Sequence, residues 1–422
     1  MTTENIQKVL IIGGGLAGLT LANALKNYGI PFAVYERDET PEHRKQGYSL
    51  ALHMCMDYLK KCLPPKRFEN FGQETCVNYE TNEGGTLFRA FDGKTGQESA
   101  TIKGEPYKAY RVSRDRFRKW LLKDIQEYVH WNKKMSHYEE SDGQVIVHFT
   151  DKTQDSGDLL VAADGALSRV TCQLYGGQEE FDKLTQISRV RGYAITQWIS
   201  EEKWNTLSVT NNQTASIVGS VSSEDRFIAE KTIRMFYTLN KIDRSRPEAP
   251  YEVISLVSAY DTDGVLPCPD GSNNQEVLQM VQSWCTSAFF GSYPHQKLIN
   301  EAPDGTVVMN LIIRERIPQA ELLAASSGHV VLIGDSAHPM TMFRGEGANH
   351  AIVDAANLAE EIYNVFGNSK PFDKAIRSYY DEMIPRGVAA VEKSHIASQK
   401  AHAGIKELVD MYEKIKKDRI GI

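Results

Sequence analysis

The strongest constraint on how this chain folds lies in its first forty residues. An apolar run, Val9–Ile12, leads directly into Gly13–Gly18, which reads GGGLAG. Such a run is typical of a strand that is buried on both faces of a parallel sheet. Apolar residues at helical spacing follow and stop at Gly29, a predicted helix cap, and a second strand, Phe32–Tyr35, then ends at Glu36. This order of strand, glycine turn, helix, strand and acid predicts an α/β unit that binds a dinucleotide.

Three glycines of this segment have separate physical purposes. Gly13 permits the tight turn, Gly15 lets the backbone approach a pyrophosphate, and Gly18 lets the helix pack closely on the strand. The pyrophosphate then faces the unpaired N–H groups of the helix N-terminus. A carboxylate at Glu36 can accept hydrogen bonds from both ribose hydroxyls of an AMP group. The motif therefore predicts an AMP-containing dinucleotide, but it does not distinguish FAD from NAD.

Composition and charge exclude several classes of protein. The 422 residues predict one large domain or two closely joined domains, and a content of 41% apolar and 24% charged residues is typical of a soluble globular protein. The net charge of −7 argues against a nucleic-acid binder. No apolar stretch reaches the roughly 18 residues that a membrane span requires, and the N-terminus has no signal-peptide pattern. Six scattered cysteines without a CxxC pair, and histidines without ligand spacing, predict reduced thiols, no bound metal and a cytoplasmic location.

Two later segments favour FAD over NAD. Residues 157–165 (GDLLVAADG) describe an apolar strand that ends at Asp164, a pattern that an ordinary Asp-Gly turn also gives. A further apolar run, His329–Ile333, ends at Asp335, which can bind a ribityl hydroxyl because it follows the carboxyl end of a strand. A helix predicted over His350 to Val365 starts with small residues, whose open N–H groups suit the electron-rich pyrimidine edge of a flavin. These small residues are Gly345, Gly347 and Ala348.

The three segments together resemble the class A, single-component flavoprotein monooxygenases, which include salicylate hydroxylases, para-hydroxybenzoate hydroxylase and fungal natural-product monooxygenases. GGGLAG with Glu36 resembles the family's FAD fingerprint, LLVAADGALS its DG motif, and GDSAHPMTMFRGEGAN its GD motif and flavin-contact loop. Residues Arg111–Leu122 (RVSRDRFRKWLL) resemble the segment whose arginine contacts FAD, and the aligned residue is Arg114. Residues Tyr379–Arg386 (YYDEMIPR) resemble the helix that closes the family's C-terminal region. The resemblance covers almost the whole chain.

This resemblance implies an α/β fold: a Rossmann-like FAD-binding domain of the para-hydroxybenzoate hydroxylase type, an inserted mixed β-sheet substrate domain, and C-terminal helices. We expect the FAD-binding domain in residues 1–181 and 305–370, the substrate sheet in 182–304, and the helical region in 371–422. Strand-like runs at 187–198, 232–239 and 253–260 support the inserted sheet. The residues expected to contact FAD are Gly13, Gly15, Leu16, Ala17, Gly18, Glu36, Arg37, Gly47, Arg114, Asp164, Asp335, Gly345, Gly347, Ala348 and Asn349.

The resemblance also implies a reaction. NADPH or NADH, as a transient co-substrate, reduces the non-covalently bound FAD, and O2 then forms a C4a-hydroperoxyflavin that hydroxylates or epoxidises a substrate. The expected substrate is an aromatic, polycyclic or isoprenoid small molecule of secondary metabolism or xenobiotic degradation, and the expected assembly is a monomer or homodimer. Three alternatives remain open: a flavin reductase or dehydrogenase without oxygen insertion, a flavin-binding protein without catalysis, and an NAD-dependent dehydrogenase. The last leaves the GDSAHP…GEGAN segment unexplained.

Residues that steer the substrate are less defined by the sequence. Arg191 lies early in the predicted substrate sheet and can orient an acidic or carbonyl group, although a surface arginine gives the same pattern. Tyr193 shares its face on a regular strand, so we predict both as catalytic residues. Tyr237, Tyr260 and His53 are weaker candidates, and His338 is interpreted as structural.

The chain departs from the family pattern at Met342, where proline is usual, at Ala162, where glycine is common, and at Thr171, where arginine is common. The absence of that arginine weakens the expectation of nicotinamide binding.

Overall fold

A five-stranded parallel sheet carries the glycine motif at its centre. The computed structural model describes residues 6–43, 47–77, 87–103, 109–207, 213–220, 231–264, 266, 273–290, 293–324 and 328–420. Because parallel strands present their carboxyl ends at one edge, the acids that follow them come together there. The sheet runs in the order β19 (Val330–Leu332), β11 (Leu159–Ala162), β1 (Val9–Ile12), β2 (Phe32–Tyr35) and β7 (Val129–His130). The predicted bounds of β1 and β2 are confirmed.

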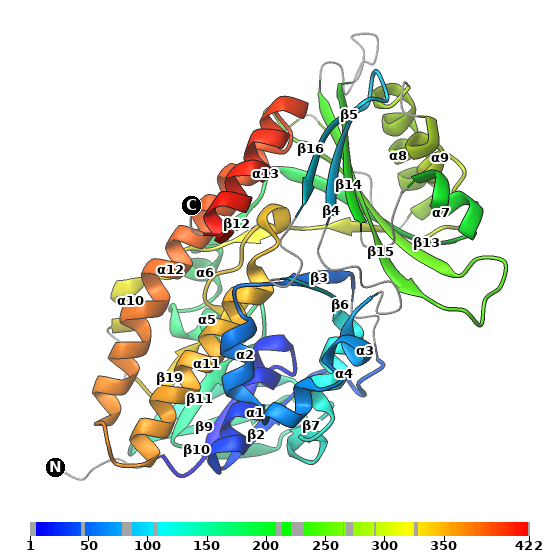
Figure 1. Ribbon diagram of the computed structural model, residues 1–422. Coiled ribbons are helices and arrows are strands. Elements are labelled where there is room, and N and C mark those ends of the chain that lie inside the picture. The colour runs from blue at the N-terminus through cyan, green and yellow to red at the C-terminus, as the bar shows by residue number, and fades with distance from the viewer. Residues whose placement is uncertain are drawn as a thin grey trace.

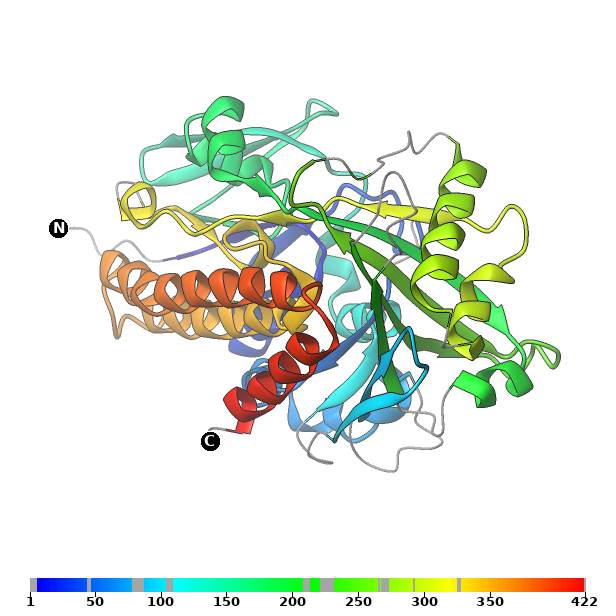
Figure 2. The same ribbon diagram turned by 90° about the horizontal axis from the view of Figure 1, so that it is seen from above.

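Helices cover one face of the parallel sheet. Helix α1 (Leu16–Tyr28) packs against α11 (Gly347–Phe366), and α12 (Phe372–Lys400) runs alongside α11 (Figure 2). Helix α1 ends at Gly29, whose φ of 70° and N–H bonds to the Leu25 and Lys26 carbonyls make it the predicted cap. The opposite face packs against the antiparallel sheet of β8 (Met135–Ser141), β9 (Gln144–Phe149) and β10 (Gln154–Gly157) (Figure 1).

A mixed seven-stranded sheet forms the second layer, above the parallel sheet in Figure 1. Helices α8 (Asn274–Ala288) and α9 (Tyr293–Asn300) pack on its outer face together with α7 (Glu201–Leu207), and its other face looks toward the parallel sheet. All strand pairs are antiparallel except β14 with β4. The strands, in order, are β17 (Val308–Leu311), β13 (Val190–Ile199), β16 (Tyr251–Tyr260), β15 (Thr232–Ile242), β14 (Gln213–Ser220), β4 (Leu87–Asp92) and β5 (Glu98–Lys103). The predicted α/β fold class, with a parallel sheet and an inserted mixed sheet, is confirmed.

The seven-stranded sheet draws on more of the chain than the predicted range 182–304. Strands β4 and β5 come from the part assigned to the FAD-binding domain, and β17 follows residue 304. Strand pairing joins segments that are distant in sequence, and no local pattern in residues 87–103 indicates which sheet they join. The substrate layer is therefore built from three stretches of the chain.

The C-terminal helices close the side of the molecule. Helix α13 (Ile405–Ile420) lies against β4, β5 and β14, where Leu408, Met411 and Ile415 are buried. No helix in the described part of the chain is long and apolar enough to cross a membrane. The remaining elements are β3 (Ser49–Leu52) paired with β6 (Tyr110–Ser113), β12 (Gln186–Ile187) paired with β18 (Arg314–Glu315), α2 (Met56–Cys62), α3 (Phe71–Thr75), α4 (Arg114–Leu122), α5 (Arg169–Leu174), α6 (Gln178–Leu184) and α10 (Ala320–Ala324).

Candidate cofactor and active site

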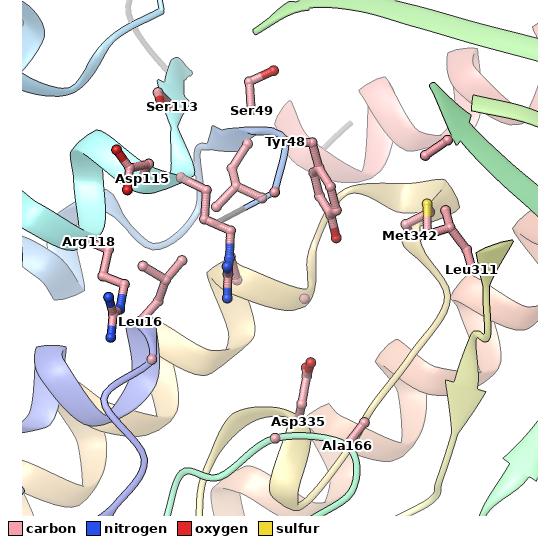
Figure 3. A pocket seen from close by; sticks show the side chains of 18 of the residues that line it. Leu16, Tyr48, Ser49, Ser113, Asp115, Arg118, Ala166, Leu311, Asp335 and Met342 are labelled. Carbon is pink, nitrogen blue, oxygen red and sulfur yellow. The ribbon is translucent and has the colours of Figure 1, made fainter. Parts of the chain in front are cut away.

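A cavity of about 1540 Å³ lies between the two sheets. Its floor is the carboxyl edge of the parallel sheet, and its roof is one face of β13, β15 and β16. Figure 3 shows Leu16 and Arg118 at one side, Asp335 below, and Met342 with Leu311 at the other side. The predicted FAD residues that line this cavity are Gly13, Gly15, Leu16, Ala17, Glu36, Arg37, Gly47, Arg114, Asp164, Asp335, Gly345, Gly347 and Ala348. Segments separated by more than 300 residues thus meet around one space.

The glycine turn has the geometry that the sequence predicts. Gly13 has a φ of 113°, and a Cβ there would lie 2.3 Å from the Ala163 carbonyl oxygen. Gly18 lies outside the cavity lining, and a Cβ on it would approach the Gly13 carbonyl oxygen to 2.1 Å. A Cβ on Gly15 would meet nothing within 4 Å. Gly13 and Gly18 therefore serve backbone packing, while Gly15 leaves open space above the helix N-terminus.

Glu36 is buried at the end of β2 and is already tied to the glycine turn. Its Oε2 accepts a hydrogen bond from the Gly14 N–H at 2.8 Å, and its Oε1 accepts one from the Asp38 N–H at 3.0 Å. Arg118 on α4 donates from Nε to the Gly14 carbonyl at 2.8 Å, and its guanidinium lies 4.0 Å from Glu36. These contacts fix the carboxylate, and each oxygen keeps a further lone pair for a ribose hydroxyl.

Two carboxylates at the strand ends face the middle of the cavity. Asp335 follows β19 and points into the cavity (Figure 3), and its enclosure by protein raises the pKa of its carboxyl. Burial likewise raises the pKa of Asp164. Asp164 Oδ2 accepts from the Arg169 N–H at 2.8 Å, while the buried Oδ1 has no hydrogen-bond partner among the described residues. Both acceptors are available to hydroxyl donors of a ligand.

The start of α11 borders the same space. Gly345 has a φ of 64° and no atom near its Cβ position, and Gly347 begins the helix beside Ala348. Asn349, in contrast, does not line the cavity. Its Nδ2 donates to the Ala51 carbonyl at 2.9 Å and its Oδ1 accepts from the His53 N–H at 2.9 Å, so its side chain ties β3 to α11. Asn349 was predicted to bind the cofactor; its side chain holds β3 against α11 outside the lining, and the His53 side chain also lies outside the lining.

These residues fit FAD. The open glycine positions, the unpartnered Asp164 oxygen and the Glu36 carboxylate lie along one continuous space, and the N-termini of α1 and α11 both open onto it. Helix N-termini favour negative charge, which the pyrophosphate and the reduced flavin ring both carry.

The roof corrects the prediction for Arg191 and Tyr193. Tyr193 is 1% exposed and packs edge-on against Trp284 of α8, on the outer face of the sheet. Arg191 pairs with Asp261, with its Nε and Nη2 each 3.2 Å from Oδ2, and it does not line the cavity. The two residues share a face of β13, as predicted, but this is the outer face of the sheet and not the face that lines the cavity. Strand β13 is apolar on both faces, so the alternation of its side chains did not reveal which face looks inward.

The alternate positions of the same strands form the inner face. Arg234, Phe236, Thr238 and Asn240 of β15 line the cavity, as do Ala194, Thr196 and Trp198 of β13 and Ile254 and Leu256 of β16. Two of the three weaker candidates, Tyr237 and Tyr260, do not lie there: Tyr237 is buried on the outer face with its hydroxyl bonded to the Leu207 carbonyl, and the Tyr260 hydroxyl accepts from Gln399. The inner face therefore combines apolar side chains with polar and charged ones, which include Arg234, Lys241 and Glu252.

Arg316 accounts for one departure from the family pattern. Thr171 is buried, and its hydroxyl donates to the Ser336 carbonyl at 2.9 Å. Arg316, 1% exposed, donates to that same carbonyl at 2.7 Å and to the Ala166 carbonyl at 3.3 Å. A cation from outside both motifs therefore joins the DG loop to the GD turn. Met342, the other main departure, lines the cavity beside Leu311 (Figure 3).

His338 has the structural environment that the sequence suggested. It is fully buried, and its Nε2 lies 2.7 Å from Asp354 Oδ2 on α11. Asp354 also accepts from the Gly334 N–H at 2.7 Å and from Arg386 of α12 at 2.8 Å. This cluster, which we call the GD-turn network, joins the turn after β19 to two helices.

The sequence patterns did not single out most of the arginines at or beside the cavity, among them Arg111, Arg118, Arg234 and Arg316. Arg118 and Arg316 hold backbone carbonyls of the motif turns, while Arg111 and Arg234 line the cavity below and within the roof. Arg111 begins the segment that contains Arg114, and the alternation of residues 234, 236, 238 and 240 along the strand was the available signal for Arg234. Outside the cavity, His137, Glu139 and His148 meet on the β8–β9 hairpin with their ligand atoms within 4.8 Å, a grouping that spacing did not reveal.

Comparison with known proteins agrees with this geometry. The model of a family described as "FAD binding domain" matches residues 7–282 and 314–394. A curated protein of Arthroderma benhamiae, named "Probable FAD-dependent monooxygenase", is 30% identical over 427 residues, which cover 95% of this chain and 93% of that protein. The structure of Klebsiella pneumoniae HpxO complexed with FAD and uric acid has a TM-score of 0.70 at 21% identity, covering 98% of this chain and 94% of that one. The structure of 2,6-dihydroxypyridine-3-hydroxylase from Arthrobacter nicotinovorans also gives 0.70, at 17% identity, covering 94% and 93%.

Proposed function

This chain belongs to the FAD-binding family of flavoprotein monooxygenases, and on that premise we propose that it uses NAD(P)H and O2 to hydroxylate or epoxidise an aromatic, polycyclic or isoprenoid small molecule. It is an FAD-dependent monooxygenase, as its curated relatives are named. One observation carries the proposal. The cavity runs from the dinucleotide turn, past Asp335, to a roof whose apolar side chains include Phe236, Ile254 and Leu256.

Bound FAD would supply hydride acceptance from the reduced nicotinamide and activation of O2, and the chain would supply position and electrostatics. Glu36 would hold the ribose of the AMP half, and the N-terminus of α1 would face the pyrophosphate. Asp335 and Asp164 would accept hydroxyl bonds from the ribityl chain. The N-terminus of α11 at Gly347 would stabilise negative charge on the reduced ring.

The roof would exclude water from the reacting atoms. Phe236, Leu256 and Leu311 present apolar surface to the cavity, and Met342 completes this wall from the loop before α11. Water promotes loss of activated oxygen as hydrogen peroxide, so an apolar wall favours transfer to the substrate. A substrate held against this wall would be flat and largely apolar.

Product mass tests the proposal directly. FAD-loaded enzyme is screened with phenolic and polycyclic compounds, scoring NADPH or NADH oxidation, oxygen uptake and product mass under 18O2. The expected result is substrate-stimulated oxidation and a product that carries one 18O, with no label when 18O is supplied only as water. A product without 18O favours a reductase or dehydrogenase, and a protein that stays colourless with added FAD contradicts the proposal.

A further inference from the structure

Three potential metal ligands meet on the outer surface of the β8–β9 hairpin, outside the cavity lining. They are His137 and Glu139 of β8 and His148 of β9, and their candidate ligand atoms all lie within 4.8 Å of one another. The Nε2 atom of each histidine lies 3.6 Å from Glu139 Oε1. Ligands that surround a tetrahedral zinc ion at about 2.0–2.1 Å lie about 3.3 Å from one another, so the three groups are close to the spacing that one ion requires.

A β-bulge places the two ligands of β8 on one face. The register of the hairpin shifts between Met135 and His137, which makes Ser136 the extra residue of β8. In a regular strand, His137 would share the buried face of Met135. The bulge turns His137 outward instead, to the face that carries Glu139 and to a position directly opposite His148. Side chains in such a cross-strand pair have their Cβ atoms about 4.5–5.5 Å apart, so both histidines can reach one ion.

Hydrogen bonding leaves the Nε2 lone pairs of the two histidines available. Nδ1 of His137 lies 3.1 Å from Ser136 Oγ, and when this nitrogen donates its proton to the hydroxyl, Nε2 is the unprotonated nitrogen. Metal-binding histidines commonly hold their second nitrogen in this way. His148 Nε2 is enclosed by protein and has no hydrogen-bond partner in the described structure. A buried polar atom without a partner is uncommon, and a bound cation would satisfy it.

The two imidazole rings are stacked, with their centroids 4.4 Å apart and their planes inclined by 5°. Because a histidine binds an ion in the plane of its ring, the rings must turn out of this parallel arrangement to share one ion. The side chains of His137 and His148 are 50% and 24% exposed, and that of Glu139 is 60% exposed. All three can therefore turn without displacing the buried core.

We propose that His137, Glu139 and His148 form a Zn²⁺ site that fastens β8 to β9. Two imidazoles and one carboxylate suit Zn²⁺ and disfavour Mg²⁺ and Ca²⁺, which prefer sets of oxygen ligands. The site adjoins a support of the FAD floor, because Tyr138, between two of the ligands, exchanges hydrogen bonds of 3.1 and 2.7 Å with Gln173 of α5, the helix that follows the DG loop. None of the three ligands lines the cavity, so the ion would stabilise the hairpin and take no part in the oxygen chemistry.

The test uses tag-free, FAD-loaded enzyme that is freed of metals with a chelator and then titrated with Zn²⁺ against a chromophoric competitor. Wild-type enzyme should bind one Zn²⁺ per chain, and millimolar Mg²⁺ should not displace it. His148→Gln should weaken Zn²⁺ binding by about 100-fold or more, because loss of a mere outer-shell partner already costs about 10- to 100-fold. Zn²⁺ should also raise the melting temperature of the wild type and leave that of His148→Gln unchanged, because only the folded hairpin assembles the site.

Matched variants separate this site from ordinary surface histidines. His43 is likewise a partly exposed histidine beside a carboxylate, Glu39, but no group of three ligands forms around it among the described residues. His43→Gln should therefore leave Zn²⁺ binding unchanged. The electron paramagnetic resonance spectrum of bound Cu²⁺ should show two nitrogen ligands in the wild type and one in His148→Gln. If His148→Gln fails to fold, His137→Gln makes the same test at a more exposed position.

Zn²⁺ binding that survives both His137→Gln and His148→Gln overturns the proposal, because the ion would then lie elsewhere. Failure of the wild type to bind Zn²⁺ at micromolar concentration overturns it as well, as does an equal loss of binding in His43→Gln. Since the titration needs neither NAD(P)H nor a substrate, its result does not depend on whether the enzyme inserts oxygen.

Discussion

At the scale of single residues, Gly15 and Gly18 differ in what a methyl group would meet. Gly18→Ala places a Cβ 2.1 Å from the Gly13 carbonyl oxygen, whereas Gly15, with a φ of −84°, has open space. We expect Gly18→Ala to destabilise the apoprotein by about 2 kcal/mol or more. Gly15→Ala should leave apoprotein stability nearly unchanged and weaken FAD binding, because its methyl group would project into the space that the pyrophosphate requires.

Thermal denaturation with and without FAD measures both effects, and each variant is the control for the other. Unchanged FAD affinity in Gly15→Ala would show that the cofactor does not approach this turn.

Asp335 is expected to lower the stability of the apoprotein and to strengthen the binding of FAD. Burial raises the pKa of its carboxyl in the folded protein, so the folded state binds this proton more tightly than the unfolded state does. Its contribution to apoprotein stability therefore declines as pH rises from the ordinary aspartate pKa of 3.8 through the raised pKa. At neutral pH we expect Asp335→Asn to raise the melting temperature of the apoprotein and to weaken FAD binding by about 10-fold or more.

Calorimetry on the apoprotein and flavin titration measure these opposed effects. Asp115→Asn, a neighbouring cavity acid on α4 that has an ion pair with Lys119, serves as the control. A fall in both apoprotein stability and FAD affinity on Asp335→Asn would contradict this interpretation, since it would indicate a structural role.

At the scale of elements, the GD-turn network holds the turn after β19 against α11 and α12. Although burial alone would raise the pKa of Asp354, the charges of His338 and Arg386 hold it well below its usual range. Burial opposes the charged form of His338, but Asp354 outweighs it, and the pKa of His338 is raised. Asp335 also raises the pKa of His338, whereas the positive charge of Arg386 lowers it. Burial and the charges of His338 and Arg386 lower the pKa of the neighbouring His350. The network therefore behaves as a buried ion pair.

This predicts a pH-dependent cost of His338→Asn. A raised histidine pKa contributes stability that is fully present below the ordinary histidine pKa of 6.5 and is lost as pH rises through the folded pKa. The variant should therefore be more destabilising at about pH 6 than at about pH 9. Asp354→Asn should cost about 3–5 kcal/mol, because it leaves buried cations unpaired. Denaturant unfolding at several pH values measures both, and a cost of His338→Asn that does not change with pH would argue for a neutral histidine.

The sequence could predict those strands that are buried on both faces and those turns that require a glycine with positive φ. Strands β1 and β2 are buried on both sides, and Gly13 and Gly29 mark the ends of the neighbouring elements with positive φ. Strand β13 shows the limit of such signals. Its face is chosen by packing against α8, whose residues lie some 80 positions away, so the pattern could place Arg191 and Tyr193 on a common face without identifying the cavity side.

The same limit applies to Arg234 and Arg316. Each acts at the cavity or its motifs through strand pairing and long-range contacts, and neither lies in a recognisable motif. The FAD floor could be predicted because its residues follow strand ends in fixed motifs. The roof could not, because the chemistry of its inner face depends on the register of seven strands from separate stretches of the chain.

At the scale of the whole molecule, the cavity separates two buried cores. One surrounds the parallel sheet and includes α1 and α11, and the other lies between the seven-stranded sheet and α8 and α9. The two clusters share no residue, whereas the third cluster, at α13, joins the roof to the C-terminal helices. FAD is expected to lie along the boundary and to contact the floor more than the roof.

This arrangement predicts that ligands stabilise the two layers unequally. ADP, which fills only the AMP half at Glu36, should stabilise the floor alone, while FAD spans the cavity and should stabilise both layers. A ligand at 1,000 times its Kd adds about 4 kcal/mol to the state that binds it. We therefore expect the apoprotein to unfold in two steps in calorimetry, ADP to raise only one of them, and FAD to raise both. Because Trp198, Trp204 and Trp284 lie in the roof layer and Trp120 and Trp131 in the floor layer, replacing either set with phenylalanine assigns each step by fluorescence. If ADP raised both steps equally, the layers would be coupled through α13 and the strand connections rather than through the cofactor, and Leu408→Ala in that third cluster would then separate them.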